Sequence, residues 1–327
     1  MKALRVALLV GGIALLGALL YRVGAGAVTQ TLARLTWWQF ALVCLPYGLI
    51  MAVDSLGWRY AFPGAAPSYP RLLAARTAGE AINVVTALGS VGGEAVKVWL
   101  LRPAIPYEES VPSVIIAKTT ATVAQALFLA IGLAVAVASA AVDRQVVVAM
   151  TALLGVEIVL VGGFVGVQLA GLVARGGRLV VWTGLATDTA HAERLDRSLR
   201  QYYLGRPGRC ALSVGLHLAG WLLGALEAAV MLLVLQVPAG LTLALVIESL
   251  GSGVRFASFL VPGAVGVLEG ANTGAFAALG LGAGAGLAFT LVRRARQAVW
   301  IAIGLIVLVV ARAQATRAEV TPLRAAR

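Results

Sequence analysis

The sequence predicts an all-α fold: a polytopic transmembrane helical bundle with two re-entrant or broken-helix segments in inverted orientation. Apolar residues make up 60% of the chain and charged residues only 12%, and the mean hydropathy is +0.93. An ordinary soluble domain has about 45–50% apolar and about 25% charged residues. The apolar residues gather in runs long enough to cross a bilayer. We therefore expect residues 1–327 to form a single integral membrane domain.

Positive charge dominates the ionisable residues, with 26 Lys or Arg against 14 Asp or Glu. Most of the excess lies between apolar segments, as it does in the cytoplasmic loops of membrane proteins. The basicity therefore indicates membrane topology and no nucleic-acid partner. The chain has only two cysteines, Cys44 and Cys210, and two histidines, His191 and His217. This set fits neither a disulfide framework nor a metal centre, and no cofactor is expected.

Five apolar runs are interpreted as spans in the order Met1–Leu20, Trp37–Phe62, Val111–Val142, Val146–Val173 and Cys210–Leu235. A signal peptide is the alternative for the first run, and in either case the N-terminus starts in the cytoplasm. The loop Ala174–Arg209 carries seven arginines, so the positive-inside rule assigns it to the cytoplasm. Within this loop, Asp188–Arg200 is interpreted as a short surface helix or a solvated connector.

The segment Leu72–Leu101 holds residues that are costly at membrane depth, namely Arg76, Glu80, Asn83, Glu94 and Lys97. Two crossings separate its end from the cytoplasmic arginine-rich loop, so the segment begins and ends on the cytoplasmic side. A re-entrant hairpin broken near Gly89–Gly93 would do this, and so would two short spans. Irregular backbone at membrane depth is tolerated where protein buries it or where it lines a wet cavity, which favours the hairpin.

The segment Leu241–Leu279 repeats this pattern. It holds Glu248 and Arg255, and its sequence Gly263-Ala264-Val265-Gly266 echoes Gly89-Ser90-Val91-Gly92. Ala298–Ala311 is expected to be the last crossing, into a cytoplasmic C-terminus, so Leu241–Leu279 would begin and end outside. This topology makes it the inverted counterpart of Leu72–Leu101. It also places three arginines, Arg293, Arg294 and Arg296, at the outer interface, against the positive-inside rule.

Two interrupted segments in opposite orientation are typical of transporters built on inverted repeats, in which the substrate binds where the broken helices meet. A structural bundle is the alternative, because intramembrane charges also form ion pairs that only fix packing. Neither interpretation needs a nucleotide, since the sequence has no nucleotide-binding motif. A transporter of this kind would be driven by an ion gradient or by mass action.

Two motifs carry a family resemblance: Gly92–Arg102, with the sequence GGEAVKVWLLR, and Pro262–Glu269, with the sequence PGAVGVLE. Together they resemble the signature regions of the flippase-like family that includes the transmembrane domain of lysylphosphatidylglycerol synthase and stand-alone, partly hopanoid-associated proteins. The first motif departs from the family where Gly89 and Val91 replace a frequent proline and basic residue. The resemblance implies a polytopic domain that handles a polar lipid between leaflets. With no aminoacyl-transferring domain after Arg327, the chain is not expected to synthesise lysyl lipid.

The leading hypothesis is a lipid translocase or flippase-like protein of the bacterial plasma (inner) membrane, with both termini cytoplasmic. Its substrate would be a membrane lipid with a polar or anionic headgroup, bound in a central polar groove. Lys97 and Arg255 would hold the phosphate, while Glu94 and Glu269 would balance charge or bind an amine or a proton. The candidate substrate-binding residues are Glu80, Asn83, Gly93, Glu94, Lys97, Glu248, Arg255, Pro262, Gly263, Gly266 and Glu269.

Two other functions stay open. The first is an integral-membrane enzyme of lipid modification, with Glu80, Glu94 or Glu269 as acid and base. No nucleophile beside a histidine and no aspartate-rich metal motif accompanies them, so we do not expect an enzyme. The second is an accessory subunit of a lipid-synthesis complex, with lipid-biosynthesis enzymes as its partners.

Overall fold

The structure is a computed structural model that describes residues 21, 35–85, 91–140, 142–172 and 190–325. Within these ranges every regular element is helical. Helices long and apolar enough to cross a membrane are α3 (Trp37–Tyr60), α6 (Tyr107–Ala138), α7 (Arg144–Leu169), α10 (Pro207–Val234) and the part of α13 (Ala283–Ala325) up to Ala313. The predicted all-helical, multi-pass fold is therefore confirmed, while the predicted span Met1–Leu20 lies outside the described residues.

Local sequence explains where the spanning helices begin and end. The side chain of Gln39 accepts a hydrogen bond from the backbone N–H of Thr36 (2.9 Å), which satisfies a donor at the start of α3. Asp143 caps α7 by accepting from the N–H of Gln145 (2.7 Å). The cap fixes the start of α7 after α6 has ended at Ala138, and the two helices pack side by side.

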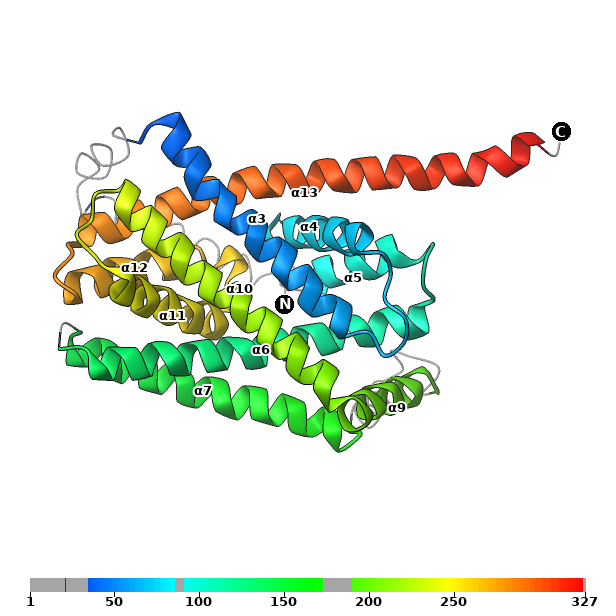
Figure 1. Ribbon diagram of the computed structural model, residues 1–327, viewed down its shortest axis with the longest axis horizontal. Coiled ribbons are helices and arrows are strands. Elements are labelled where there is room, and N and C mark those ends of the chain that lie inside the picture. Colours follow the sequence, from blue (N-terminus) through cyan, green and yellow to red (C-terminus); the bar gives the residue numbers. More distant parts are fainter. Residues whose placement is uncertain (1–20, 22–34, 86–90, 141, 173–189, 326–327) are drawn as a thin grey trace.

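Two pairs of shorter helices enter the bundle from opposite ends (Figure 1). The first pair is α4 (Tyr69–Val85) with α5 (Val91–Leu101), and the second is α11 (Leu241–Ala257) with α12 (Val267–Ala278), joined through the 3₁₀ turn η1 (Pro262–Ala264). In Figure 1 the first pair comes from the right and the second from the left, and η1 contacts α4. The tips of the two pairs therefore meet inside the bundle.

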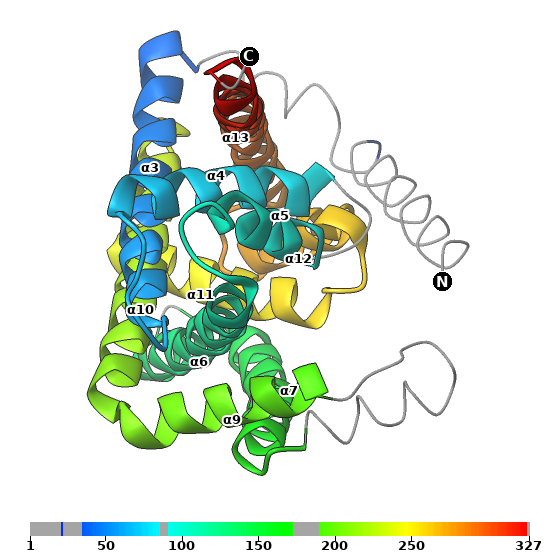
Figure 2. The ribbon, with the colours of Figure 1, turned by 90° about the vertical axis from the view of Figure 1, so that its right-hand side faces the viewer.

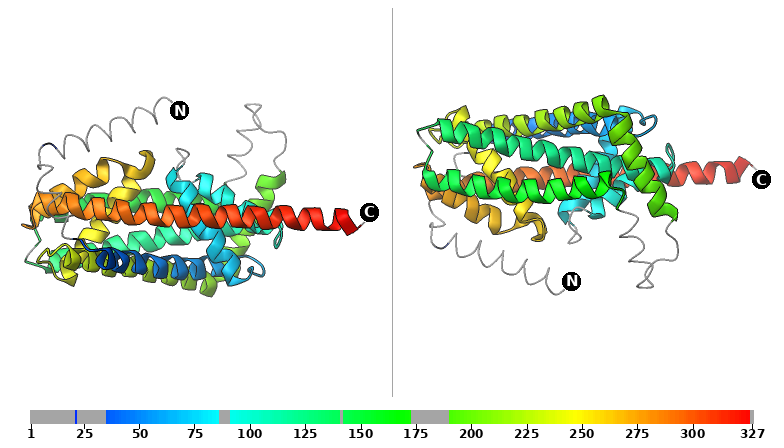
Figure 3. Two further views of the ribbon diagram at one scale, coloured as in Figure 1. Left: turned by 90° about the horizontal axis from the view of Figure 1, so that it is seen from above. Right: turned by 90° about the horizontal axis from the view of Figure 1, so that it is seen from below.

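The long helices surround these pairs. Figure 2, which looks along the bundle, shows α3 and α10 together on one side and the four short helices between α13 and α6. The contacts agree, because α13 packs on α4 and α12, whereas α6 packs on α5 and α11. The two views in Figure 3 show α13 running the length of the bundle and on past its end. Several spanning helices thus enclose the short helices together, with α13 on one side and α6 on the other.

The structure corrects the sequence prediction for α13. The helix begins at Ala283, well before the predicted crossing Ala298–Ala311, and Arg293 lies ten residues inside it. At 1.5 Å per residue Arg293 lies about 15 Å along the axis from the start of the helix, so Arg293, Arg294 and Arg296 fall inside the apolar span Ala283–Ala313 and not before it. The prediction was wrong because the positive-inside rule counts arginines as loop residues. Here each arginine has a carboxylate partner on another helix, which offsets the cost of its depth.

Apolar packing is divided between two clusters. One is centred on Met150, Met231 and Phe276, and the other on Trp58, Phe62 and Tyr202. Along α10 the second cluster reaches Cys210 and the first begins at Ala228. The polar residues His217, Trp221 and Glu227 lie between them along the chain. The ion-paired side chains of the bundle, which we call the charged layer, therefore lie between the two apolar clusters along α10.

The arginine-rich segment forms a helix, α9 (Ala190–Gly205), with one face packed on the bundle. Leu199 and Tyr202 are fully buried there, and the Tyr202 hydroxyl donates to the carbonyl oxygen of Tyr60 (2.8 Å). The interpretation as a solvated connector is therefore wrong for this face. Arginines on the other face stay exposed, as the sequence suggested.

Tyr202→Phe tests whether this contact anchors α9. The substitution removes one buried hydrogen bond and should lower the free energy of unfolding by about 1 kcal/mol. Thermal unfolding in detergent measures it. Tyr107→Phe, at an exposed tyrosine, is the control and should leave stability unchanged. Equal effects of the two substitutions would mean that the Tyr202 hydroxyl contributes nothing.

Candidate functional site

The tip of the α4–α5 pair carries three of the predicted site residues in one contact. Lys97 donates to Glu94 at 2.9 Å, and Asn83 donates to the same carboxylate at 3.5 Å. Asn83 also accepts from the backbone N–H of Gly93 (2.8 Å), which joins the two helices. The ammonium of Lys97 lies 5.9 Å from the ring centroid of Trp58. Sequence analysis placed these residues in one site, and the structure brings them together.

Close approach of α4 and α5 depends on two glycines. A Cβ on Gly79 would lie 2.7 Å from Cγ of Lys97 and 2.8 Å from the carbonyl oxygen of Gly93. A Cβ on Gly93 would overlap the carbonyl oxygen of Gly79 and the side chain of Asn83. Both contacts involve backbone, which cannot rotate away. Gly93 therefore sets the helix spacing that lets Glu94 and Lys97 form their pair beside Asn83.

The second charged contact is centred on Glu248 of α11. Oε1 of its carboxylate accepts a hydrogen bond from Nη2 of Arg255 (2.7 Å), and Oε2 pairs with Arg293 of α13. The guanidinium of Arg255 also lies 5.7 Å from the ring centroid of Trp221 on α10. One carboxylate thus balances two guanidinium groups, so this part of the bundle has a surplus cation.

The third contact closes the turn between η1 and α12. The N–H of Gly266 donates to Oε2 of Glu269 (2.7 Å), and Nε of Arg294 donates to Oε1 of the same carboxylate (2.9 Å). Nη1 of Arg294 also donates to the carbonyl oxygen of Gly263 (2.7 Å). Gly263 and Gly266 have φ of +59° and +79°, which glycine adopts without strain. The PGAVG turn is therefore held by a carboxylate and a guanidinium at once, and Pro262 begins it.

Three arginines close together on α13 form ion pairs with carboxylates on three different helices. Consecutive residues on an α-helix are rotated by about 100°, so arginines at positions 293, 294 and 296 must point in different directions. They pair with Glu248 of α11, Glu269 of α12 and, at 2.7 Å, Glu227 of α10. Arg296 also lies 4.0 Å from the ring centroid of Tyr47 on α3. Helix α13 is the element that joins the charged layer.

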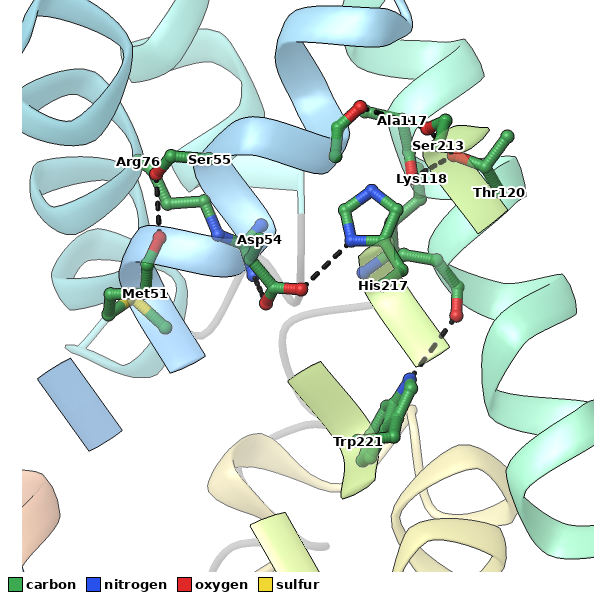
Figure 4. Close-up of polar contacts among 12 residues, drawn as sticks. Met51, Asp54, Ser55, Arg76, Ala117, Lys118, Thr120, Ser213, His217 and Trp221 are labelled. Carbon is green, nitrogen blue, oxygen red and sulfur yellow. Dashed lines mark hydrogen bonds and ion pairs between the residues drawn. The ribbon is translucent and has the colours of Figure 1, made fainter. Parts of the chain in front are cut away.

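A further polar group lies between α3, α4 and α10 (Figure 4). Asp54 accepts from Arg76 at 2.5 Å through one oxygen and pairs with Nδ1 of His217 at 2.9 Å through the other. Glycines make room for it, since a Cβ on Gly57 would lie 2.9 Å from the His217 ring and one on Gly220 would lie 2.9 Å from Asp54. The site prediction did not include this group.

Most of the predicted residues take part in these contacts. Glu80 instead lines a small pocket with Tyr47 and Gln297, between α3, α4 and α13. The prediction missed Arg76 on the short helix α4 and six residues on the long helices, namely Asp54, His217, Glu227, Arg293, Arg294 and Arg296. A charged residue inside an apolar run was the signal that could have found Asp54 and Glu227. The arginines of α13 needed the correct start of that helix.

Comparison with known families adds an independent observation. The sequence model of the lysylphosphatidylglycerol synthase TM region matches residues 3–311. The chain belongs to this family. As a member of the lysylphosphatidylglycerol synthase TM-region family with several apolar helices, it is a membrane protein of lipid metabolism or transport. No curated protein and no solved structure matches the chain.

Exposure separates the charges of this chain into two groups. The side chains of Glu227, Glu248 and Glu269 are 3%, 6% and 1% exposed, so their ion pairs are internal. The side chains of Arg255 and Glu94 are 28% and 19% exposed. An exposed charge can exchange its partner for a ligand, whereas a buried one cannot do so without unpacking. Arg255 and Glu94 are therefore residues that can meet a ligand, as is Arg294, whose side chain is 24% exposed.

Proposed function

We propose that this protein moves a polar or anionic membrane lipid between leaflets, as a flippase-like translocase. The observation that carries the proposal is the arrangement around Glu248. Arg255 can leave this carboxylate for a phosphate while Arg293 keeps it paired. No buried charge is then stranded, which avoids the main cost of rearranging an intramembrane ion pair. A headgroup phosphate is the ligand that a partly exposed guanidinium fits best.

The opposite half of the site supports the same function. Glu94 lies at the tip of the α4–α5 pair with its carboxylate partly exposed, while Lys97 holds it from the buried side. A cationic part of a headgroup, or a proton, can be balanced there. In this proposal the headgroup stays among polar side chains while the acyl tails remain in lipid. This lowers the cost of carrying charge through hydrocarbon.

The proposal includes a topology. The α4–α5 and α11–α12 pairs are re-entrant hairpins in inverted orientation, and their meeting point is the substrate site. The end of the bundle with Arg59, Arg71, Arg102 and the arginines of α9 faces the cytoplasm of a bacterial inner membrane. The C-terminus then lies on that side, and so does the N-terminus if Met1–Leu20 crosses the membrane as the sequence predicts. The protein forms no covalent bond with its lipid and receives it from lipid-biosynthesis enzymes.

Reconstitution of the purified chain into liposomes tests the proposal. The assay follows transbilayer movement of labelled lipids with anionic, zwitterionic and cationic headgroups, with protein-free liposomes as the baseline. Faster movement of at least one headgroup class is expected with protein. No acceleration for any headgroup would contradict the proposal.

Arg255→Gln is the variant that locates the site. Loss of a charge-assisted hydrogen bond to phosphate should slow lipid movement about tenfold or more. Arg144→Gln, at an exposed arginine at the start of α7, is the matched control and should be unaffected. The unfolding transition of both variants is measured in parallel. If Arg255→Gln lowers stability and leaves the transport rate of the folded protein unchanged, Arg255 is a structural residue.

A further inference from the structure

Glu157 is a buried carboxylate that the proposed lipid site does not use. It lies near the middle of α7, with no exposed surface, although its neighbours Val156 and Ile158 are 48% and 58% exposed. It belongs to the inward-facing stripe of the helix, whose buried members are Val146, Met150, Glu157, Val161 and Gln168. Their spacing of four and seven residues is that of a helix seam, where apolar residues are the rule. A carboxylate therefore stands where a Met or Val would ordinarily pack.

Among the described residues, neither oxygen of Glu157 has a hydrogen-bond partner. The helices packed against α7 are α6, α9, α11 and α12. Their charged residues are Glu108, Glu109 and Lys118 on α6, Glu193, Arg194, Asp196, Arg197 and Arg200 on α9, Glu248 and Arg255 on α11, and Glu269 on α12. Among the described residues, none of these side chains interacts electrostatically with Glu157. Its surroundings therefore differ from those of the ion-paired carboxylates, which are Asp54, Glu94, Glu227, Glu248 and Glu269.

The missing partner decides the protonation state. An ionised carboxylate in an apolar interior without a partner costs many kcal/mol, and such a group takes up a proton instead. A metal cation is a poor alternative, since it would need several oxygen ligands around the site. Among the described residues, no group of three His, Cys, Asp or Glu side chains is placed to hold a metal ion. The ligand that fits Glu157 is a proton.

The position of Glu157 relates it to the second hairpin. One turn earlier on the same face, Leu153 packs against Gly253 of α11, where a Cβ would lie 3.3 Å from Leu153. Helices α7 and α11 run in the same direction from the left-hand end (Figure 1), and α11 ends at Ala257, one turn beyond Gly253. Glu157 therefore faces the region where α11 gives way to the η1 turn. A displacement of this hairpin at Gly253 would act on the face of α7 that carries Glu157.

We propose that Glu157 is an intramembrane proton-binding site that loads and releases its proton as the α11–α12 hairpin moves. Protonation makes the carboxyl neutral, so the α7 seam can close over it. When the hairpin moves and the seam opens, water reaches the carboxyl and removes the proton. The link to lipid movement rests on the proposed translocase function. The proton-binding site itself does not, so the two can be tested separately.

Carbodiimide labelling tests the site without any transport assay. Dicyclohexylcarbodiimide adds the O–H of a protonated carboxyl across its C=N bond, and the adduct rearranges to a stable N-acylurea. At neutral pH, where ordinary carboxyls are ionised, mass spectrometry of the full chain in nanodiscs should find the adduct on Glu157. The paired Glu248 and Glu269 serve as internal controls and should stay unlabelled.

Two variants complete the labelling test. Glu157→Gln keeps a neutral side chain of the same shape, so it should fold as the wild type does while losing the adduct. Raising the pH should remove the adduct from wild-type protein as the carboxyl ionises. No adduct on Glu157 at neutral pH, or equal labelling of Glu248, would overturn the proton-binding site.

The second measurement tests the link to transport. Lipid movement is followed in proteoliposomes with and without a pH gradient. The wild-type rate should respond to the gradient, and Glu157→Gln should keep lipid movement and lose the response. An equal response in both proteins would overturn the link. If wild-type protein moves no lipid at all, the proposed function fails and the labelling result still decides whether Glu157 binds a proton.

Discussion

Glu248→Gln is expected to lower the free energy of unfolding by about 3–5 kcal/mol, because breaking a buried ion pair leaves an uncompensated charge in the interior. Two guanidinium groups lose their partner at once, those of Arg255 and Arg293. The Arg293 side chain is only 11% exposed, so water cannot replace the carboxylate. Unfolding in detergent, followed by the loss of helical circular dichroism, measures the effect.

The control for this substitution is Glu108→Gln, at an exposed glutamate in the first turn of α6. It makes the same chemical change and should alter stability by less than about 0.5 kcal/mol. In the double variant Glu248→Gln with Arg293→Gln, the most deeply buried stranded charge is gone, so part of the loss should be recovered. Equal stabilities for Glu248→Gln and Glu108→Gln would show that the pair with Arg293 carries no stability.

The distinction between Glu248 and Arg255 refines the two interpretations that the sequence left open. Sequence analysis treated the intramembrane charges either as a substrate site or as structural ion pairs. Burial assigns Glu248 and Glu269 to internal pairs and leaves Arg255 and Glu94 accessible. The same charged layer therefore contains both kinds of residue. A test of function must use the accessible ones, and a test of stability the buried ones.

Apolar runs predicted the long helices well. Val111–Val142, Val146–Val173 and Cys210–Leu235 lie within a few residues of α6, α7 and α10, because burial in lipid and helix formation both follow hydrophobicity. Polar residues inside Leu72–Leu101 and Leu241–Leu279 marked the segments that contain two short helices each. These features depend on local sequence alone.

Contacts between distant helices could not be predicted in the same way. The partners of Arg293 and Arg296 lie on α11 and α10, and a sequence pattern gives no direction for a side chain until the helix packing is known. The glycine run before α13 also hid the start of that helix. Gly280 and Gly282 have φ of +71° and +87° and form the turn, whereas Gly284 and Gly286 are already helical. Composition alone does not separate these two roles of glycine.

Gly93→Ala is expected to be the most damaging of the small substitutions at the site. The new methyl group would overlap the carbonyl oxygen of Gly79 and the side chain of Asn83, so α4 and α5 would have to separate. Overpacking of this kind costs about 1–3 kcal/mol, and the hydrogen bond between the N–H of Gly93 and Asn83 adds about 1 kcal/mol when it breaks. A loss of about 3 kcal/mol in the free energy of unfolding is therefore expected.

The matched control is Gly162→Ala on α7, where a Cβ would meet nothing within 4 Å. Alanine is the better helix former, so this variant should be unchanged or up to about 1 kcal/mol more stable. Separation of α4 from α5 also moves Glu94 away from the tip, so lipid movement by Gly93→Ala should fall with stability, including in conditions where the variant remains folded. Gly162→Ala should keep the wild-type rate. If Gly93→Ala matches Gly162→Ala in both measurements, close contact of the α4–α5 pair is not what positions the Glu94 carboxylate.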